Sequence, residues 1–311
     1  MTGTKVGNAV FVKLVRQMGG TGMLPDVPDT RYGPVRSAFV DVCVVGAGPA
    51  GLAAALRVAS LRPQDKVLVI DQQRALGGSW LAEPGGQEHV AGLQRQVAAA
   101  NVDVWLGSTA LGHYPEDDGD LLKGVTDAVP GVMAVLRANH VALIRARRFV
   151  FATGTYEQNL PFPSNDAPGV VAARALGRLV FARGLLPTRK VKLLLDSQHF
   201  FSYPDRLGSA LLGLGVDVVR VEHNPGADVR PGRNTTVAVA TLPAPAFELA
   251  RHHGIETTMR PAAGGFAVDA HATGETTAAG VFVAGDVTGY VGPQNAETHG
   301  QAVGFIVASS L

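Results

Sequence analysis

A glycine-rich turn between a predicted strand and a predicted helix constrains the fold of this chain more than any other feature. The strand covers Val40–Val45 (VDVCVV), the turn begins at Gly46, and the helix covers Pro49–Ser60. A second strand, Lys66–Asp71 (KVLVID), follows the helix. Short β-branched runs that alternate with helical stretches are typical of parallel α/β sheets. The sequence therefore predicts a βαβ unit of the Rossmann type.

The turn has the spacing of a dinucleotide-binding fingerprint, Gly46-x-Gly48-x-x-Gly51. The first glycine permits a tight turn, the second lets the backbone approach a pyrophosphate, and the third allows close helix–strand packing. The helix start presents unpaired N–H groups and a positive dipole end to the phosphates. Asp71 lies about 20 residues after Gly51, where a carboxylate accepts hydrogen bonds from ribose hydroxyls and repels a 2′-phosphate. These features predict an adenine nucleotide site that disfavours NADP, formed by Gly46, Gly48, Pro49, Ala50, Gly51, Asp71 and Gln72.

Three later signals favour a flavin-type site over that of a plain NAD dehydrogenase. Gly77-Gly78 would let the backbone approach the cofactor a second time. Ala152-Thr153-Gly154 ends a predicted strand, and Gly285-Asp286 resembles the second FAD motif, whose aspartate accepts a hydrogen bond from the ribitol chain. A helix that starts at Pro293 would point its N-terminus at an isoalloxazine. The predicted site is therefore completed by Gly77, Gly78, Ala152, Thr153, Gly154, Gly285 and Asp286.

The remaining pattern predicts the order of elements and domains. A helix is expected at 87–100, a strand at 102–106, and an antiparallel meander of short strands at 132–137, 141–145 and 148–152. The last elements are a strand at 281–284 and a helix at 293–309. The predicted fold class is α/β: an FAD/NAD(P)-binding Rossmann-like domain, with a parallel sheet plus an antiparallel β-meander, and a smaller inserted second Rossmann-like domain. The expected boundaries are 1–40 for an N-terminal helix (8–18) and arm, 41–158 plus 265–311 for the dinucleotide-binding domain, and 159–264 for the insert.

The inserted segment lacks a nucleotide fingerprint of its own. A second βαβ pattern runs from Lys190–Leu195 through a helix near 204–214 to Val216–Val221. The turn after Leu195 contains no glycine, so side chains would stand between a pyrophosphate and the helix N-terminus. We therefore expect no pyridine nucleotide here and interpret the segment as a scaffold or a protein interface, with His199 as a turn or core residue. The stretch 223–247 gives no clear pattern.

Charge and cysteine content argue against several functions. The chain has 311 residues, a formal net charge of +1 and one cysteine, Cys43. We therefore expect no nucleic-acid binding, no disulfide-redox pair, no iron–sulfur cluster on this chain and no metal site. Glycines and a proline interrupt the longest apolar stretch, Val42–Leu56, so no membrane span is expected and a cytoplasmic location is predicted. Charged residues form only 17% of the chain, which fits either a Gly- and Ala-rich core or a subunit that buries surface against a partner or cofactor.

Several stretches outside the fingerprint are more specific. They are the arm Gly19–Tyr32 (GGTGMLPDVPDTRY), the run Arg145–Val171 (RARRFVFATGTYEQNLPFPSNDAPGVV) and the C-terminal GVFVAGDVTGYVGPQNAETHGQAVG. Together with the fingerprint through Leu56, they resemble the α-subunit core of heteromeric amine-oxidising flavoenzymes. That family includes sarcosine oxidase, opine oxidase, dye-linked proline and hydroxyproline dehydrogenases, and hydrogen cyanide synthase.

The resemblance implies a division of labour between subunits. A secondary amine or amino acid would be oxidised at a C–N bond on the FAD of a partner β subunit, and a further flavin, FMN, would lie near the α/β interface. Small additional subunits also fit this resemblance. The α-type chain would hold its own nucleotide, FAD first, with NAD or ATP as alternatives, through Gly46, Gly48, Gly51 and Asp71. This sequence departs from the family in lacking a ferredoxin-like module, a cysteine cluster and a folate-binding extension.

The function predicted from these observations is a nucleotide-binding subunit of an amine or amino-acid dehydrogenase or oxidase complex. Two alternatives are a stand-alone FAD-dependent NAD(P)H oxidoreductase and a non-catalytic scaffold with bound nucleotide. No side chain is a convincing catalytic acid, base or nucleophile, which is compatible with chemistry that depends mainly on the cofactor. We interpret Tyr156, Glu157, His113 and His299, which lie near the family motifs, as surface or supporting residues.

Overall fold

The computed structural model describes residues 4, 7–8, 11–12, 14–15, 33–114, 127–196, 201–226 and 229–311. Contacts divide the chain into two compact units, Met1–Pro34 and Val35–Leu311. In the first unit, the described residues of the predicted helix 8–18 are helical. The arm predicted over 19–32 lies outside the described residues.

The larger sheet of the second unit combines parallel and antiparallel strands. It has seven strands in the order β3-β2-β1-β6-β5-β4, and β15 pairs with the end of β6. The pairs β3-β2, β2-β1, β1-β6 and β6-β15 are parallel, whereas β4, β5 and the start of β6 form an antiparallel meander. The strands are β1 (Arg36–Val45), β2 (Val67–Asp71), β3 (Val102–Leu106), β4 (Ser108–Tyr114), β5 (Val132–Arg137), β6 (His140–Phe151) and β15 (Val281–Val283).

The meander differs from the prediction in one strand. The segments 141–145 and 148–152 are one continuous strand, β6, and the remaining strand of the meander is β4, which the sequence analysis missed. The parallel register of β6 with β1 continues through Arg145–Arg148, with Val40 opposite Ala146 and Val42 opposite Arg148. Arg147 and Arg148 remain within the strand because their guanidinium groups form hydrogen bonds with Asp127, Ser310 and Leu311, as described below.

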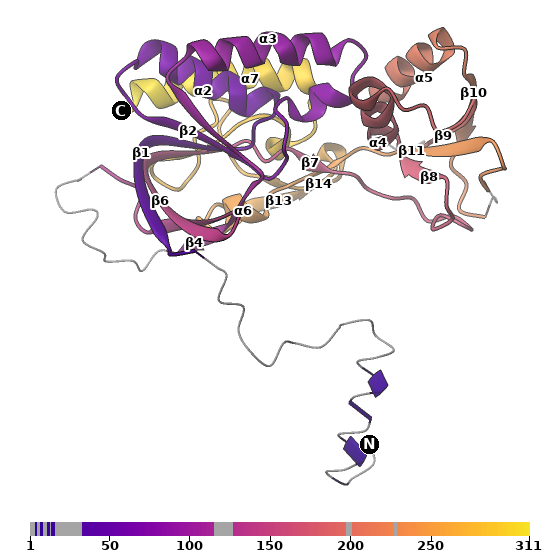
Figure 1. Ribbon diagram of the computed structural model, residues 1–311, viewed down its shortest axis with the longest axis horizontal. Helices are drawn as coiled ribbons and strands as arrows, with labels where there is room; N and C mark the ends of the chain where they lie inside the picture. The colour runs from indigo at the N-terminus through magenta and orange to yellow at the C-terminus, as the bar shows by residue number, and fades with distance from the viewer. Residues whose placement is uncertain are drawn as a thin grey trace. The chain divides into compact units, whose positions relative to one another are not determined.

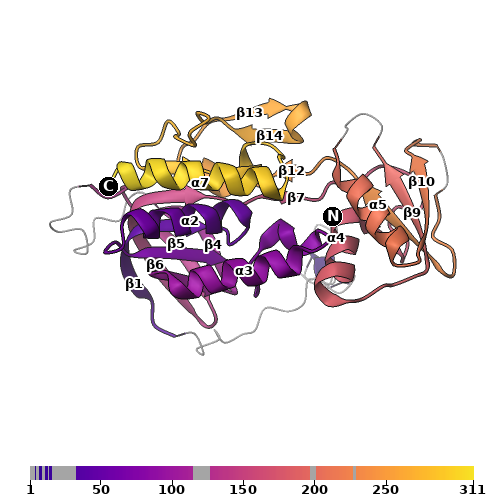
Figure 2. The same cartoon turned by 90° about the horizontal axis from the view of Figure 1, so that it is seen from above.

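Three helices cover one face of the larger sheet, as Figures 1 and 2 show: α2 (Pro49–Leu61), α3 (Gly86–Ala99) and α7 (Pro293–Ser309). All three were predicted from helical spacing, and buried Val, Leu and Ala side chains fill the layer between them and the sheet. The opposite face buries a second core that includes Ile144, Phe149 and Phe151. Beneath it lie α6 (Glu248–Arg251) and the hairpin of β13 (Thr257–Arg260) and β14 (Gly265–Val268).

The smaller sheet is entirely parallel, in the order β10-β9-β11-β8. Its strands are β8 (Val170–Ala172), β9 (Lys190–Leu195), β10 (Asp217–Glu222) and β11 (Thr235–Ala240). Helix α5 (Tyr203–Gly213) joins β9 to β10, which confirms the second βαβ unit. The unassigned stretch 223–247 contains β11, an almost completely buried strand between β9 and β8, together with β12 (Ala244–Pro245), which pairs with β7 (Thr155–Tyr156).

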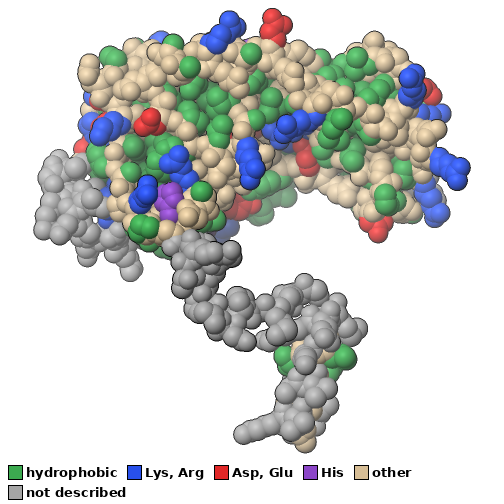
Figure 3. All heavy atoms as spheres, in the orientation of Figure 1, with side chains coloured by type: hydrophobic (Ala, Val, Ile, Leu, Met, Phe, Trp, Pro, Cys, Tyr) green, Lys and Arg blue, Asp and Glu red, His purple; other side chains and the backbone are tan. Residues whose placement is uncertain are grey.

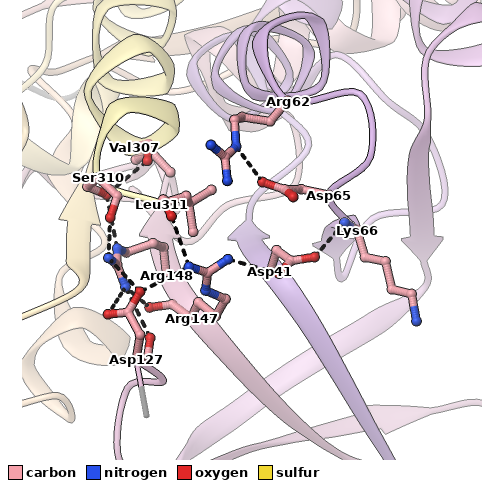
Figure 4. Close-up of polar contacts among 10 residues, drawn as sticks. All are labelled: Asp41, Arg62, Asp65, Lys66, Asp127, Arg147, Arg148, Val307, Ser310 and Leu311. Atoms are coloured by element: carbon pink, nitrogen blue, oxygen red, sulfur yellow. Dashed lines mark hydrogen bonds and ion pairs between the residues drawn. The ribbon is translucent and has the colours of Figure 1, made fainter. Parts of the chain in front are cut away.

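Two arginines on β6 hold the end of α7 against the sheet (Figure 4). Arg148 donates from Nε to Ser310 Oγ over 2.9 Å and from Nη1 to Asp127 Oδ1 over 3.1 Å. Arg147 donates from Nη2 to the backbone oxygen of Leu311 over 2.9 Å. Hydrogen bonding from Arg148, and then from Arg147, lowers the pKa of the Asp127 carboxyl. This network fixes the direction of α7, whose other end reaches the cavity described below.

The face of the molecule in Figure 3 shows basic and acidic side chains interspersed among uncharged and apolar ones.

None of the helices in the described ranges combines the length and the apolar character that a bilayer crossing requires. Within the same ranges, no three His, Cys, Asp or Glu side chains are grouped as metal ligands.

Candidate nucleotide-binding site

A cavity of about 400 Å³ lies where the parallel strands β1, β2, β6 and β15 end. The carboxyl ends of parallel strands are where open α/β sheets bind their ligands. Most of the predicted site residues line this cavity: Gly46, Gly48, Pro49, Ala50, Asp71, Gln72, Gly78, Ala152, Thr153, Gly154 and Asp286. The other three lie behind the lining, where Gly51 packs against Gly46, Gly77 against Val90, and Gly285 against Ala50. Segments far apart in the sequence thus converge on one site.

The fingerprint glycines separate into packing and lining positions. Gly46 has a φ of +115°, and a Cβ there would lie 2.1 Å from the backbone oxygen of Ala152. A Cβ on Gly51 would lie 1.8 Å from the backbone oxygen of Gly46. Gly48 has an ordinary φ of −83°, and its Cβ would meet only the Cα of Gly78, at 3.7 Å. Side chains are therefore excluded at Gly46 and Gly51 by the fold itself, whereas Gly48 leaves open space on the cavity side.

The Asp71 carboxylate is held in place by two backbone donors. The N–H of Ala47 donates to Oδ2 over 2.6 Å, and the N–H of Gln73 donates to Oδ1 over 2.7 Å. Burial raises the pKa of Asp71, while these hydrogen bonds and the nearby Arg178 act in the opposite direction. The carboxylate is thus oriented at the mouth of the fingerprint turn, with remaining lone pairs available for hydroxyl donors.

Two arginines that the sequence analysis did not single out also line the cavity, Arg174 and Arg178. Arg174 forms an ion pair with Glu157 and donates from Nη2 to Thr155 Oγ1 over 3.0 Å. Arg178 donates from Nη2 to the backbone oxygen of Gly78 over 3.2 Å. The sequence signal for these residues is their spacing of four, which places two cations on the same side of a helix in a predicted nucleotide-binding fold.

Asp286 lies at another part of the same cavity, after β15. It is 5% exposed, and its Oδ1 accepts the N–H groups of Val291 and Gly292 over 2.9 and 3.1 Å. Burial raises the pKa of this carboxyl. The preceding Gly285 donates its N–H to His299 Nδ1 over 3.1 Å, so His299 supports the turn from behind. Asp286 is therefore fixed at the start of α7 beside the lining residues of α2.

A smaller chamber of about 250 Å³ adjoins the first cavity. The two share Gly46, Asp71, Gln72, Thr153 and Tyr156. The smaller chamber is otherwise lined by residues of β4 and α6 and by neighbouring positions, namely Val45, Ile70, Thr109, Ala110, Leu111, Ala246, Glu248, Leu249 and His252. An elongated ligand that passes Asp71 can therefore occupy both.

The polar residues near the family motifs have different positions. Tyr156 and Glu157 line the cavity, and Tyr156 is 53% exposed at its rim. His113 lies elsewhere, stacked on His253 with ring centroids 3.8 Å apart. The glycine-free turn of the inserted segment, including His199, lies in the range 197–200, outside the described residues.

Known proteins are similar to this chain in sequence and in fold. The sequence profile of the Thi4 family matches residues 34–138. The sarcosine oxidase α subunit of Rhizobium meliloti (strain 1021) is 31% identical in an alignment 235 positions long, which covers 71% of this chain and 22% of that relative. An opine oxidase subunit from Agrobacterium tumefaciens (strain Ach5) is 24% identical in an alignment 347 positions long, which includes gaps and covers 88% of this chain and 66% of that relative. The chain thus spans about a fifth of the sarcosine oxidase α subunit.

A solved structure confirms the fold class. L-proline dehydrogenase from P. horikoshii superposes with a TM-score of 0.72 at 21% identity, covering 90% of this chain and 57% of that one. The fold resembles that of L-proline dehydrogenase, and the mixed larger sheet and the parallel smaller sheet agree with the α/β class that the sequence predicted. In sequence, the chain is similar to the sarcosine oxidase α and opine oxidase relatives, which supports the resemblance stated from the sequence.

Proposed function

We propose that this chain is the nucleotide-binding subunit of a heteromeric flavin-dependent amine or amino-acid dehydrogenase or oxidase. The observation that carries the proposal is the convergence of the fingerprint turn, Asp71 and Asp286 on one cavity. Its relatives named above are subunits of oxidases that act on sarcosine and opines. In this proposal the substrate of the complex is sarcosine, proline, hydroxyproline or an opine-like compound, oxidised in a partner β subunit.

We propose FAD as the nucleotide, with NAD and ATP as alternatives for the same site. The residues fit an adenosine diphosphate group: backbone without side chains at Gly46 and Gly48, the N-terminus of α2, and a fixed carboxylate at Asp71. Asp286 favours FAD, because a buried carboxylate in the same cavity suits the hydroxyl groups of a ribitol chain. All fourteen residues predicted from the sequence are kept in this proposal, eleven as lining and three as packing residues.

A bound flavin would supply the capacity to accept and pass on electrons. The residues of this chain bind and orient. Asp71 accepts hydrogen bonds from the ribose, the first turn of α2 faces the phosphates, and no side chain caps that turn. Asp286 holds the polar chain that continues from the phosphates. No residue of the cavity is placed here as a catalytic acid or base.

The proposed partners are inferred from the relatives named above and not from a surface of this chain. They are an FAD-containing β subunit, with FMN near the interface, and small additional subunits. We further propose the domain boundaries predicted above, 41–158 plus 265–311 and 159–264, which assign the larger and smaller sheets to separate domains. The cytoplasmic location stays a prediction.

A stand-alone NAD(P)H oxidoreductase is the second candidate, because the smaller sheet has the parallel order of a nucleotide-binding unit. Disulfide chemistry is disfavoured in that candidate, since Cys43 is the single cysteine and is completely buried in β1.

The test is identification of the nucleotide released on denaturation, first from the chain purified alone and then from the chain co-expressed with its genomic neighbours. FAD from the lone chain supports the flavin assignment. NAD or ATP moves the redox chemistry to the partners, and rapid NAD(P)H oxidation by the lone chain supports the second candidate. No nucleotide in either sample would contradict the proposed function.

A further inference from the structure

One short helical segment contributes two cations to the wall of the cavity. Helix α4 (Ala173–Gly177) continues directly into the π-helical segment η3 (Arg178–Ala182), and Arg174 and Arg178 both reach the lining. Like charges four residues apart repel each other, and burial, with the charges of Arg183 and Arg174, lowers the pKa of Arg178. Short π-helical segments recur at functional sites. The two positive charges therefore destabilise this segment, and an anion bound in the cavity would offset their repulsion.

Packing holds this segment close to the fingerprint. The Tyr203 hydroxyl donates to the backbone oxygen of Ala82 over 2.9 Å, and a Cβ on Gly177 would lie 2.0 Å from that hydroxyl. At the far end of the segment, Gln87 Nε2 donates to the backbone oxygen of Ala182 over 2.8 Å. A buried contact at one end and an exposed hydrogen bond at the other therefore hold the segment that carries Arg178.

The two arginines differ in the donors that they leave available. Arg174 is paired with Glu157 and bonded to Thr155, and its guanidinium lies 5.6 Å from the ring centre of Tyr290. For Arg178, the hydrogen bonds within the described residues are limited to the one from Nη2 to Gly78. A guanidinium carries five N–H donors in a planar fork that matches phosphate oxygens. Arg178 is thus the cation of this cavity with spare donors.

The contact with Gly78 places Arg178 beside the phosphate-binding turn. A Cβ on Gly78 would lie 2.6 Å from the Cα of Gly48, so these two glycines abut. Arg178 also lies near enough to Asp71 to act on the pKa of that carboxyl. It therefore lies between the glycine expected at the pyrophosphate and the carboxylate expected at the ribose.

We propose that Arg178 positions the diphosphate of the bound nucleotide, with Arg174 adding a second, Glu157-paired charge behind it. This inference rests on the proposed function, because it takes an adenine nucleotide as the ligand. It predicts that the site selects adenine nucleotides with a diphosphate over those with one phosphate or none. It also makes the segment α4–η3, outside the glycine fingerprint, part of the nucleotide site.

The experiment measures binding of adenosine, AMP, ADP and adenosine 2′-monophosphate by calorimetry, with the full chain after removal of retained nucleotide. The variants are Arg178→Met, which removes the charge and keeps much of the stem, and Arg178→Lys, which keeps the charge without the fork. Arg189→Met is the matched control, since Arg189 is exposed and is absent from the cavity lining. Thermal melts of all variants report on folding.

We expect Arg178→Met to weaken ADP binding about 10- to 100-fold, the range of one or two charge-assisted hydrogen bonds. Adenosine affinity should be unchanged, Arg178→Lys should be intermediate, and Arg189→Met should behave as wild type. Unchanged ADP affinity in Arg178→Met, or an equal loss for adenosine and ADP, overturns the role of Arg178 alone. A selective loss for the 2′-monophosphate overturns the diphosphate assignment. A wild-type chain that binds none of these ligands overturns the proposed function as well.

Discussion

Replacing Gly51 by Ala should destabilise the protein, although alanine is the better helix former. A Cβ at this position would lie 1.8 Å from the backbone oxygen of Gly46 and 3.0 Å from its carbonyl carbon. Ordinary contacts begin at 3.4 Å, so helix α2 and the fingerprint turn would have to separate by roughly 1.5 Å. Overpacking against backbone costs about 1–3 kcal/mol, and the gain in helix propensity returns at most about 1 kcal/mol. Because a distance of 1.8 Å to a backbone oxygen corresponds to the upper end of that range, the expected net loss is about 2 kcal/mol in the free energy of unfolding.

Gly92→Ala is the matched control. Gly92 also lies within a helix, α3, but a Cβ there would meet nothing within 4 Å. The same substitution should therefore stabilise the protein by roughly 0.5–1 kcal/mol. The two variants carry the same substitution and differ only in how the added Cβ packs. Their free energies of unfolding should therefore differ by about 3 kcal/mol.

Urea unfolding, followed by the fluorescence of Trp80 and Trp105, measures both variants, and the nucleotide retained after gel filtration is measured in parallel. Gly51→Ala should unfold at lower urea and retain less nucleotide, because the N-terminus of α2 is displaced from the cavity. Some dinucleotide fingerprints carry alanine at this position, so the substitution tests the close contact in this particular chain. Equal midpoints for Gly51→Ala and wild type would refute the close contact on which this reasoning depends.

Three other predictions concern single side chains. Asp71→Asn should weaken adenine nucleotide binding about 10- to 100-fold in equilibrium titrations, since it removes a charged hydrogen-bond acceptor; unchanged affinity would remove Asp71 from the site. Tyr203→Phe should cost about 1–2 kcal/mol in urea unfolding, because the buried backbone oxygen of Ala82 loses its donor; wild-type stability would contradict this. Burial, aided by the charges of His113 and His252, lowers the pKa of His253 from 6.5 to about 3. The stability that neutral His253 provides is therefore fully present above pH 6.5 and is lost as the pH falls towards 3. His253→Leu should flatten the decline in stability over that range, and an unchanged pH profile would show that His253 does not cause it.

The sequence predicted those parts of the fold that depend on local pattern. The βαβ unit, helices α3, α5 and α7 and the strands β9 and β10 follow from hydrophobic periodicity bounded by glycine and proline. Strand β6 was predicted as two strands, 141–145 and 148–152. What keeps it continuous is a set of partners on Asp127, Ser310 and Leu311, distant in the sequence. Strand β11 was missed for a related reason, since its place between β9 and β8 depends on non-local pairing.

The candidate site likewise contains residues that the sequence pattern identifies and residues that only non-local contacts identify. The glycines, Asp71 and Asp286 could be selected because each occupies a recognisable position after a strand. Arg178 could not, because its contact with Gly78 spans 100 residues and depends on how α4 and η3 pack against Ala82 and Tyr203. A pair of arginines four residues apart is more often a solvated helix face than a ligand site. Only the folded chain shows that this pair faces the fingerprint.

The central claim, that the cavity holds an adenine nucleotide, is tested most directly by Gly48→Val. The backbone at Gly48 has a φ that valine can adopt, and a Cβ there meets its nearest atom at 3.7 Å, so neither the backbone nor the Cβ opposes the change, and the thermal melts report on the γ-methyl groups. The added side chain would occupy the space expected for the pyrophosphate. The measurement is the amount of nucleotide released on denaturation from wild type, Gly48→Val and the control Gly92→Val, with thermal melts of each. We expect about one nucleotide per chain from wild type and control, and none from a folded Gly48→Val. Retention of the nucleotide by Gly48→Val at the wild-type level would contradict the account.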